Sequence, residues 1–596
     1  MLAAPVAQQR RFQLVLIKPS HYDDDGYVIQ WVRAVIPSNT LAVLYSLGRD
    51  AAERAILGHD TAIDITVIDE INSRVKIQKL LSQFRRNGNF GLLGIVGVQS
   101  NQFPRALDIA RPFRAAGVPV MIGGFHVSGC LAMLPELQAD LKVALDMGVS
   151  LFAGELEGRV DTILKDAADA ALKPIYNYLK ELPALESEPT PILPEKHLRR
   201  TIQSLASFDA GRGCPYQCSF CTIINVQGRK SRGRTADDVE RTIREHWKHG
   251  IRHFFITDDN LARHKHWESI FDRIIELREN HGFKVRLMVQ VDTLCHKIPN
   301  FIDKAARAGV NRVLVGMESI NAANLIAANK RQNKITEYRK MLLAWKHAGA
   351  ITTAGYILGF PFDTPESIRE DIEIIKKALP RDILEFFILT PLPGSEDHKI
   401  LYAKGEWMDA DMNRYDGEHA VSHHPKMSKE VWEEVYQDAW RTYYTREHMR
   451  TLLRRGVAAR CSKSRLIAFI YMFASSVPNE NVHPLQGGLL RRKSRLDRRP
   501  DLPIEPAWLF YPRYAARFVA GTARSARLLA WLVWTQWRIE HDPNRHAYTD
   551  QALTPVTDDE EEKLELFTHN DAARHAVEHA RKVAQLTGHG REPAVA

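Results

Sequence analysis

The 596-residue sequence predicts an α/β protein with a doubly wound parallel sheet first, a partial β/α barrel second and a mostly helical extension last. Three observations favour this fold class. Short apolar runs alternate with amphipathic helical patterns in two separate series, a proline-rich segment divides the two series, and an excess of arginine appears only near the C-terminus. At roughly 100 to 200 residues per domain, the chain accommodates three or four domains.

The first series occupies residues 12–170, behind an N-terminal tail of residues 1–11. Its predicted strands are FQLVLIKP, DITVIDE, FGLLGIVGVQS, PVMIGGFH and VSLFAGE, with helical stretches between them. This β-α repeat predicts a Rossmann-like parallel sheet with helices on both faces. Ligands of such sheets bind beyond the carboxyl ends of the strands, where this chain has Ser100, Asn101, Gly123, Gly124, His126, Gly154 and Glu155.

The second series occupies residues 204–400. Prolines in residues 171–203 predict an extended linker before it, and residues 401–455 are expected to add helices to it. Its strands are LASFDA, HFFITDD, VRLMVQVD, RVLVGME, TTAGYILGF and LEFFILTPL. Six β-α units predict a (β/α)6 partial barrel, whose chemistry would lie at the carboxyl ends of the strands.

The stretch GRGCPYQCSFC, directly after the first barrel strand, contains three cysteines, Cys214, Cys218 and Cys221. Three closely spaced thiolates can hold three irons of a four-iron cluster, which leaves the fourth iron without a protein ligand. A zinc knuckle is the alternative, but it needs a second pair of Cys or His ligands that is missing nearby. The other cysteines, Cys130, Cys295 and Cys461, are isolated and are expected to be ordinary buried residues.

The C-x3-C-x2-C spacing, with an aromatic residue before the last cysteine, resembles the radical S-adenosylmethionine (radical SAM) enzymes. The resemblance implies that the fourth iron of a [4Fe-4S] cluster binds SAM and that one electron cleaves it to a 5'-deoxyadenosyl radical. It also implies that the SAM site is lined by Phe220, Asp258, Asp259, Asn260, Gln290, Asp292, Glu318, Ser319, Gly355, Ile357, Gly359 and Thr390. The chain departs from the family after the second strand, where TDDN stands in place of the frequent Gly-Gly-Glu.

A Rossmann-like domain in front of such a core resembles the cobalamin (B12)-binding class of radical SAM proteins. RQNK at 331–334 and residues 415–428 resemble a subgroup of that class with many uncharacterised members. The resemblance implies that the residues named above at the ends of the first-series strands surround cobalamin. The D-x-H-x-x-G signature of histidine-ligated cobalamin is replaced by PSHYDDDG, so His21 is not expected to bind cobalt. A degenerate domain retained as a scaffold is the alternative.

The resemblance implies an enzyme that cleaves SAM reductively and methylates an unactivated carbon with the help of cobalamin. Its substrate would be a small or lipid-like molecule, and its electrons would come from a flavodoxin- or ferredoxin-type reductant. A radical cyclisation or oxidation that uses B12 without methyl transfer is a second hypothesis. A non-catalytic sensor that holds a cluster or B12 is a third.

The net charge of +9 arises in one segment, because residues 451–540 contain 16 Lys and Arg but only 5 Asp and Glu. The catalytic part therefore has no general charge for nucleic acid, and none is expected as a partner. The extension, residues 456–596, ends in an acidic and then His-rich tail. Its apolar runs are too short to span a membrane.

One helical pattern in the extension places five arginines on a single stripe: Arg513, Arg517, Arg524, Arg527 and Arg538. Phe518, Leu529, Val533 and Trp537 fall away from it, which predicts a helix that lies on an anionic membrane. A core-packed helix with its arginines in solvent and a helix that contacts RNA are the alternatives. With six cysteines and no secretory leader, the expected location is the cytoplasm, with peripheral contact to the inner face of the membrane.

Overall fold

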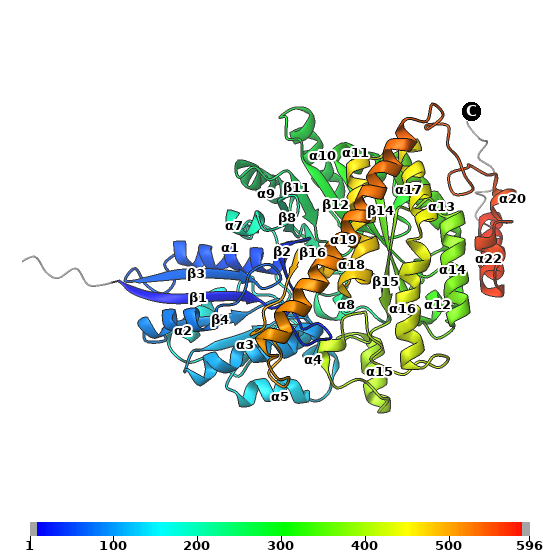
Figure 1. The fold of residues 1–596 in the computed structure, drawn as a ribbon. Coiled ribbons are helices and arrows are strands. Elements are labelled where there is room, and N and C mark those ends of the chain that lie inside the picture. Colours follow the sequence, from blue (N-terminus) through cyan, green and yellow to red (C-terminus); the bar gives the residue numbers. More distant parts are fainter. Residues whose placement is uncertain (1–8, 587–596) are drawn as a thin grey trace, which may run out of the picture.

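The computed structural model describes residues 9–586 and contains two parallel six-stranded sheets side by side, each flanked by helices (Figure 1). In spatial order the strands of the first sheet are β3 (Thr61–Asp69), β1 (Arg10–Lys18), β4 (Gly91–Ile95), β5 (Val120–Gly123), β6 (Ser150–Ala153) and β7 (Ile175–Asn177). The five predicted strands are all present. β7 is additional and lies in the predicted linker, where it pairs with β6 and extends the sheet.

Helices cover both faces of this first sheet, so it is doubly wound as predicted. They are α1 (Asn39–Glu53), α2 (Ile77–Arg86), α3 (Phe103–Ala115), α4 (Phe125–Met133), α5 (Ala139–Asp146) and α6 (Val160–Ala168). α1 and α6 pack with Leu14 and Leu16, whereas α2, α3 and α5 pack with Val15 and Ile17. Because successive side chains of a strand point to opposite faces, the run LVLI in β1 serves both layers.

The second sheet is the predicted partial barrel. Its neighbouring strands are β8 (Leu205–Phe208), β11 (His253–Ile256), β12 (Arg286–Val291), β13 (Val310–Glu318), β14 (Ile351–Leu358) and β15 (Ile383–Ile388), and every pair is parallel. The connecting helices are α9 (Ala236–Lys248), α10 (Trp267–Glu279), α11 (Phe301–Ala308), α12 (Ala322–Ala327), α13 (Ile335–His347) and α14 (Pro365–Ala378). Thr235 and Thr364 cap α9 and α14 with their side chains, which fixes where these helices begin.

The chain after the barrel is mostly helical, as predicted. Its main elements are α15 (Glu396–Lys404), α16 (Lys429–Tyr443), α17 (Arg446–Ala458), α18 (Lys463–Glu480), β16 (Gly488–Arg492), α19 (Ala507–Glu540) and α22 (Asp571–Leu586). β16 pairs antiparallel with β2 (Gln30–Ala34), so the extension is joined to the N-terminal domain.

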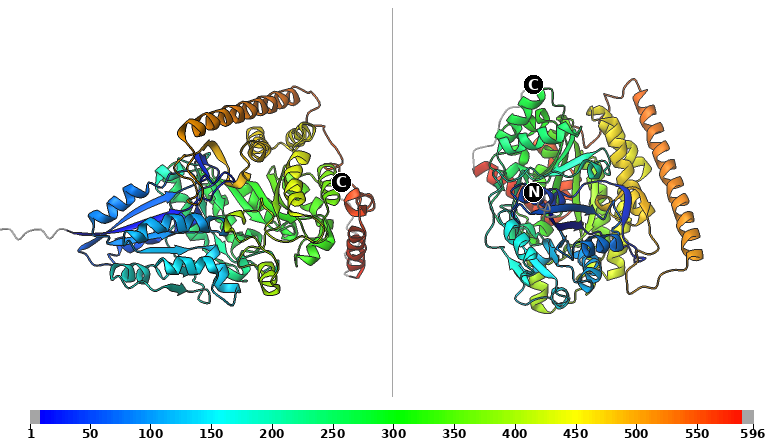
Figure 2. Two further views of the ribbon diagram at one scale, coloured as in Figure 1. Left: turned by 60° about the horizontal axis from the view of Figure 1, so that its bottom comes forward. Right: turned by 90° about the vertical axis from the view of Figure 1, so that its left-hand side faces the viewer.

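α19 is a single long helix on the outside of the molecule, against α17 and α18 (Figure 2). Phe510, Leu532 and Ile539 are buried on its inner side. Its five predicted arginines are all exposed, and a second exposed face beside them carries apolar residues. No helix within residues 9–586 has the length and hydropathy needed to cross a membrane.

Candidate active site

The cysteine loop lies between two short paired strands, β9 (Gly211–Arg212) and β10 (Arg232–Gly233). Cys214, Cys218 and Cys221 are free thiols. The Cys221 amide donates to the Cys218 carbonyl at 3.2 Å, and the Cys214 amide donates to Gly228 at 3.2 Å. Burial, with a smaller contribution from the neighbouring thiols, raises the pKa of Cys221 to about 12. The fold therefore holds three soft ligands together within one short loop.

The thiols are not arranged around a single point. Within residues 9–586, no three Cys, His, Asp or Glu side chains converge as the ligands of one metal ion would. A four-iron cluster has a different requirement, since each thiolate binds a separate iron. The three thiolates of the loop could each bind one iron of such a cluster.

Five residues predicted to line the SAM site lie behind this loop. Asp258 accepts hydrogen bonds from the amides of Ala210 and Gly211 at 2.7 and 2.8 Å, and burial raises its pKa to about 8. Gln290 donates to the Asp258 carbonyl, and Asn260 donates to Asp292. Burial also raises the pKa of Asp259, the fifth residue, to about 6.

Asp292 extends this network to the loop itself. It accepts from Arg263 at 2.6 Å and from Tyr216, which lies between the first two cysteines, at 3.2 Å. The hydrogen bond from Tyr216 therefore links these strand ends to the cysteine loop.

Glu318 is the polar residue at the end of β13, and its backbone has a φ of 64°, which is unusual for a residue other than glycine. Its carboxylate forms an ion pair with Lys330. Lys330 is buried, lies over the Phe220 ring at 5.5 Å, and keeps a raised pKa because Glu318 outweighs the effect of burial. The sequence analysis missed Lys330, whose only signal was its place beside the RQNK motif.

The remaining predicted SAM residues have separate surroundings. Ser319 is buried and accepts from the Asn321 amide at 3.0 Å. Gly355 lies near the Glu318 carboxylate. Gly359 has a φ of 96°, and a Cβ there would lie 2.0 Å from the Trp432 ring, so the packing of Trp432 is sufficient to require glycine.

A cavity of about 720 Å³ lies where the two sheets meet. The N-terminal domain contributes Ser100 and Asn101 to its wall, and the barrel contributes Phe220, Glu318, Ile357 and Thr390. The extension adds His483, Leu485 and Gln486, which the sequence analysis did not predict. Residues predicted for two different ligands therefore face one shared space.

A second cavity of about 200 Å³ opens beside it and extends into the N-terminal domain. Its wall is mainly apolar and includes Gly123, Gly124, Gly154 and Glu155. Asn39 lines both cavities, and its Oδ1 is buried without a hydrogen-bond partner. The two cavities share Asn39, Thr40, Gly97 and Phe125 in their walls.

Of His21 and His126, only His21 lines the large cavity. Burial lowers the pKa of His21 to about 4, so its ring is neutral near pH 7. His126 lies outside both cavity walls. Its Nδ1 is 3.2 Å from the Ser100 hydroxyl and its Nε2 is 2.8 Å from Asp140, so both ring nitrogens have partners within the domain.

Glu155 connects the N-terminal domain to the cysteine loop. It accepts from Arg212 at 2.7 Å and from Arg232 at 3.0 Å, and Arg212 also donates to Glu157 at 2.6 Å. Arg212 and Arg232 lie on β9 and β10, which flank the loop. These buried ion pairs fix the position of the cysteines relative to the first sheet, and the sequence pattern gave no sign of the two arginines.

Comparison with known proteins agrees with this geometry. The radical SAM superfamily model matches residues 210–375. Bacteriochlorophyllide d C-8(2)-methyltransferase of Chlorobaculum tepidum is 27% identical over 355 residues, which cover 56% of this chain and 73% of that protein. Hopanoid C-2 methylase of Rhodopseudomonas palustris is 25% identical over 298 residues, which cover 48% of this chain and 53% of that protein.

Two solved structures share the fold. TsrM from Kitasatospora setae, a radical S-adenosylmethionine methyltransferase with cobalamin and a [4Fe-4S] cluster bound, gives a TM-score of 0.53 at 14% identity and covers 72% of this chain and 88% of its own. OxsB, a cobalamin-dependent S-adenosylmethionine radical enzyme, gives 0.52 at 12% identity and covers 96% of this chain and 83% of its own. Residues 210–375 therefore match the radical SAM superfamily, and the chain shares its overall fold with TsrM and OxsB.

Proposed function

We propose that this protein is a cobalamin-dependent radical SAM methyltransferase that acts on an unactivated carbon. One observation carries the proposal: the 720 Å³ cavity is lined jointly by the strand ends of the Rossmann-like domain and by those of the barrel beside the cysteine loop. A ligand bound by the first domain would therefore face a ligand bound by the second.

The residues of the barrel fit a cluster and SAM. Cys214, Cys218 and Cys221 would hold the cluster, which supplies the electron that cleaves SAM when it is bound. Phe220 and Glu318 form the adjoining wall, and Lys330 pairs with Glu318 behind it. These residues would orient a charged sulfonium ligand. The Gln332 side-chain amide already donates to Cys218 Sγ at 3.3 Å, as a hydrogen bond to a thiolate would require.

The residues of the first domain fit cobalamin, which supplies a methyl carrier when it is bound. The apolar side cavity is suited to the tail of a large cofactor, and the large cavity to its head. The unpaired Asn39 Oδ1 is a free acceptor at the junction of the two. Both ring nitrogens of His126 have partners within the domain, so it has no free nitrogen for cobalt. That His21 does not bind cobalt rests on the replacement of the D-x-H-x-x-G signature by PSHYDDDG.

The proposed reaction consumes two SAM molecules and two electrons in each turnover. One SAM leaves as S-adenosylhomocysteine after giving up its methyl group, and the other leaves as methionine and 5'-deoxyadenosine after taking a hydrogen from the substrate. The chain's own residues would position these molecules within the shared cavity. The electrons would come from a flavodoxin- or ferredoxin-type reductant.

The test is a single-turnover assay with anaerobically reconstituted protein, reductant and metabolite extract from a strain that lacks the gene. We expect 5'-deoxyadenosine, S-adenosylhomocysteine that depends on added cobalamin, and one extract component heavier by a methyl group. Formation of 5'-deoxyadenosine without a methylated product would favour cyclisation or oxidation. A protein that holds an intact cluster but cleaves no SAM would favour the hypothesis of a non-catalytic sensor.

We also propose that the substrate is a small or lipid-like molecule and that the protein contacts a membrane only at its surface. The apolar residues Ile357, Leu389 and Leu392 in the cavity wall support a substrate with apolar surface. Vesicle binding, described below, tests the second part separately.

A further inference from the structure

α19 has an outward face that is continuously apolar. Successive turns present Trp508, Val519, Val533, Trp534 and Trp537, whose exposed fractions range from 50 to 76%. The positions between them on this face are also exposed and uncharged: Pro512, Ala515, Ala516, Ala523, Ala526 and Ala530. We call these eleven residues the outer stripe; large exposed apolar surfaces of this kind mark interaction sites.

The opposite face of α19 holds the helix to the protein. Leu532 is buried, Asn479 of α18 donates to Ser525 at 2.9 Å, and Tyr514 donates to the Arg491 carbonyl at 3.0 Å. Lys463 at the start of α18 pairs with Glu540 at 3.2 Å. The helix is therefore anchored along its length, and the outer stripe is not needed for its folding.

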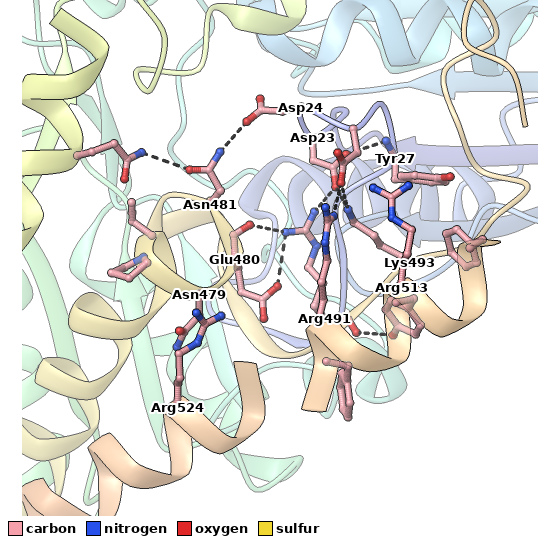
Figure 3. A pocket seen from close by; sticks show the side chains of 18 of the residues that line it. Asp23, Asp24, Tyr27, Asn479, Glu480, Asn481, Arg491, Lys493, Arg513 and Arg524 are labelled. Atoms are coloured by element: carbon pink, nitrogen blue, oxygen red, sulfur yellow. Dashed lines mark hydrogen bonds and ion pairs between the residues drawn. The ribbon is translucent and has the colours of Figure 1, made fainter. Parts of the chain in front are cut away.

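The arginines of α19 divide into two groups. Arg513, Arg517 and Arg524 line a polar pocket beneath the helix that also contains Asp25 and Glu480 (Figure 3). Arg517 pairs with Asp25 at 2.7 Å. By helical position, Arg527 and Arg538 lie instead at one border of the outer stripe.

We propose that the outer stripe is a docking surface for an anionic lipid membrane. Tryptophan is favoured at the boundary between headgroups and acyl chains, and this stripe carries tryptophan near both of its ends. Arginines at its border would meet lipid phosphates, and α19 has no acidic residue before Glu540. A second copy of the chain is a poorer occupant, because pairing would bring two basic helices together.

The geometry allows such contact without any change in the fold. α19 stands clear of both sheets along the outside of the molecule (Figure 2), so that the whole stripe can lie flat on a surface. With 34 residues at about 1.5 Å per residue, the helix extends roughly 50 Å. Membrane contact would place the catalytic domains beside the bilayer, where a lipid-like substrate is found.

The test is co-sedimentation of the full-length protein with vesicles of phosphatidylcholine alone or mixed with phosphatidylglycerol. We expect binding to the mixed vesicles, weakened by salt, and at least a tenfold loss of binding in the double variant Val519→Glu, Val533→Glu. Both valines are exposed, so the variant should keep its fold. The matched control is Val143→Glu, which changes an exposed helical valine on α5 and should bind like the wild type.

Two further measurements keep the outcomes distinct. Arg527→Gln with Arg538→Gln should weaken binding to the mixed vesicles only. SAM cleavage in detergent-free buffer should be unchanged in all of these variants, which separates this inference from the proposed function. The proposal would be overturned if the wild-type protein bound neither kind of vesicle, or if the double glutamate variant bound vesicles as well as the wild type. It would also be overturned if the wild type were a dimer that the two glutamates dissociate, because the outer stripe would then contact a second copy.

Discussion

Cys218 is the most buried of the three clustered thiols and the one that accepts a hydrogen bond from Gln332. We predict that Cys218→Ala abolishes both the cluster absorbance after anaerobic reconstitution and the cleavage of SAM, because loss of one thiolate exposes a second iron. Cys295→Ala is the control, since Cys295 is buried against Trp345 elsewhere in the barrel. A Cys218 variant with a full cluster and wild-type cleavage would contradict the assignment.

The buried pair of Lys330 and Glu318 offers a second test at the scale of single residues. Lys330→Met leaves a buried carboxylate without its partner, which we expect to lower the free energy of unfolding by roughly 3 kcal/mol. Adding Glu318→Gln should recover much of that loss, as urea titration of the single and double variants would reveal. If the Lys330–Glu318 pair also orients SAM, the double variant should bind SAM more weakly than the wild type even though its stability has recovered. A double variant with wild-type affinity for SAM would show that the pair has only a structural role.

His419 is a single residue whose ion pairs should make stability depend on pH. It pairs with Asp24 at 3.1 Å and with Asp416 at 2.9 Å. Burial would lower its pKa, but the two carboxylates raise it to about 10. The folded state therefore binds this proton more tightly than the unfolded state, so the pair stabilises fully below about pH 6.5 and the effect is lost as pH rises toward 10. Thermal unfolding of wild type and His419→Gln should differ most at low pH; a difference that grows with pH would contradict this.

At the scale of elements, the loop between β5 and α4 depends on glycine for backbone reasons. Gly124 has a φ of 148°, and a Cβ there would lie 2.1 Å from the Val98 amide. We predict that Gly124→Ala destabilises the protein by about 3 kcal/mol or more. Gly123→Ala, where the nearest atom is the Phe152 carbonyl at 3.2 Å, should have a smaller effect in the same chemical denaturation assay. Equal effects would refute the backbone explanation.

The elements were predictable from sequence to the extent that local patterns determine them. Apolar runs located the strands of both sheets, and the amphipathic stretches between them located helices such as α9 and α14. β7 was missed because its three residues are too few to show a period. The arginine stripe of α19 is exposed as its spacing predicted, but helical spacing did not reveal that much of the apolar face is exposed as well.

At the scale of the whole molecule, the sequence indicated both groups of site residues but could not show that they share one cavity. That result depends on contacts such as Glu155 with Arg212, which join residues far apart in the chain. The sequence also did not indicate that the extension reaches the site, yet His483 and Gln486 line the cavity and β16 pairs with β2. Removal of all residues after 455 should therefore impair folding.

The central claim is that the side cavity of the first domain holds cobalamin beside the SAM site. Leu44 is half-buried on α1 and lines that cavity, so Leu44→Trp would fill it with little disturbance of the core. The most direct measurement is equilibrium dialysis of cobalamin against wild type and this variant, with the cluster absorbance as a check on folding. We predict binding by the wild type and at least a tenfold weaker affinity in Leu44→Trp with its cluster intact. Wild-type protein that binds no cobalamin, or a variant that binds it equally well, would contradict the account.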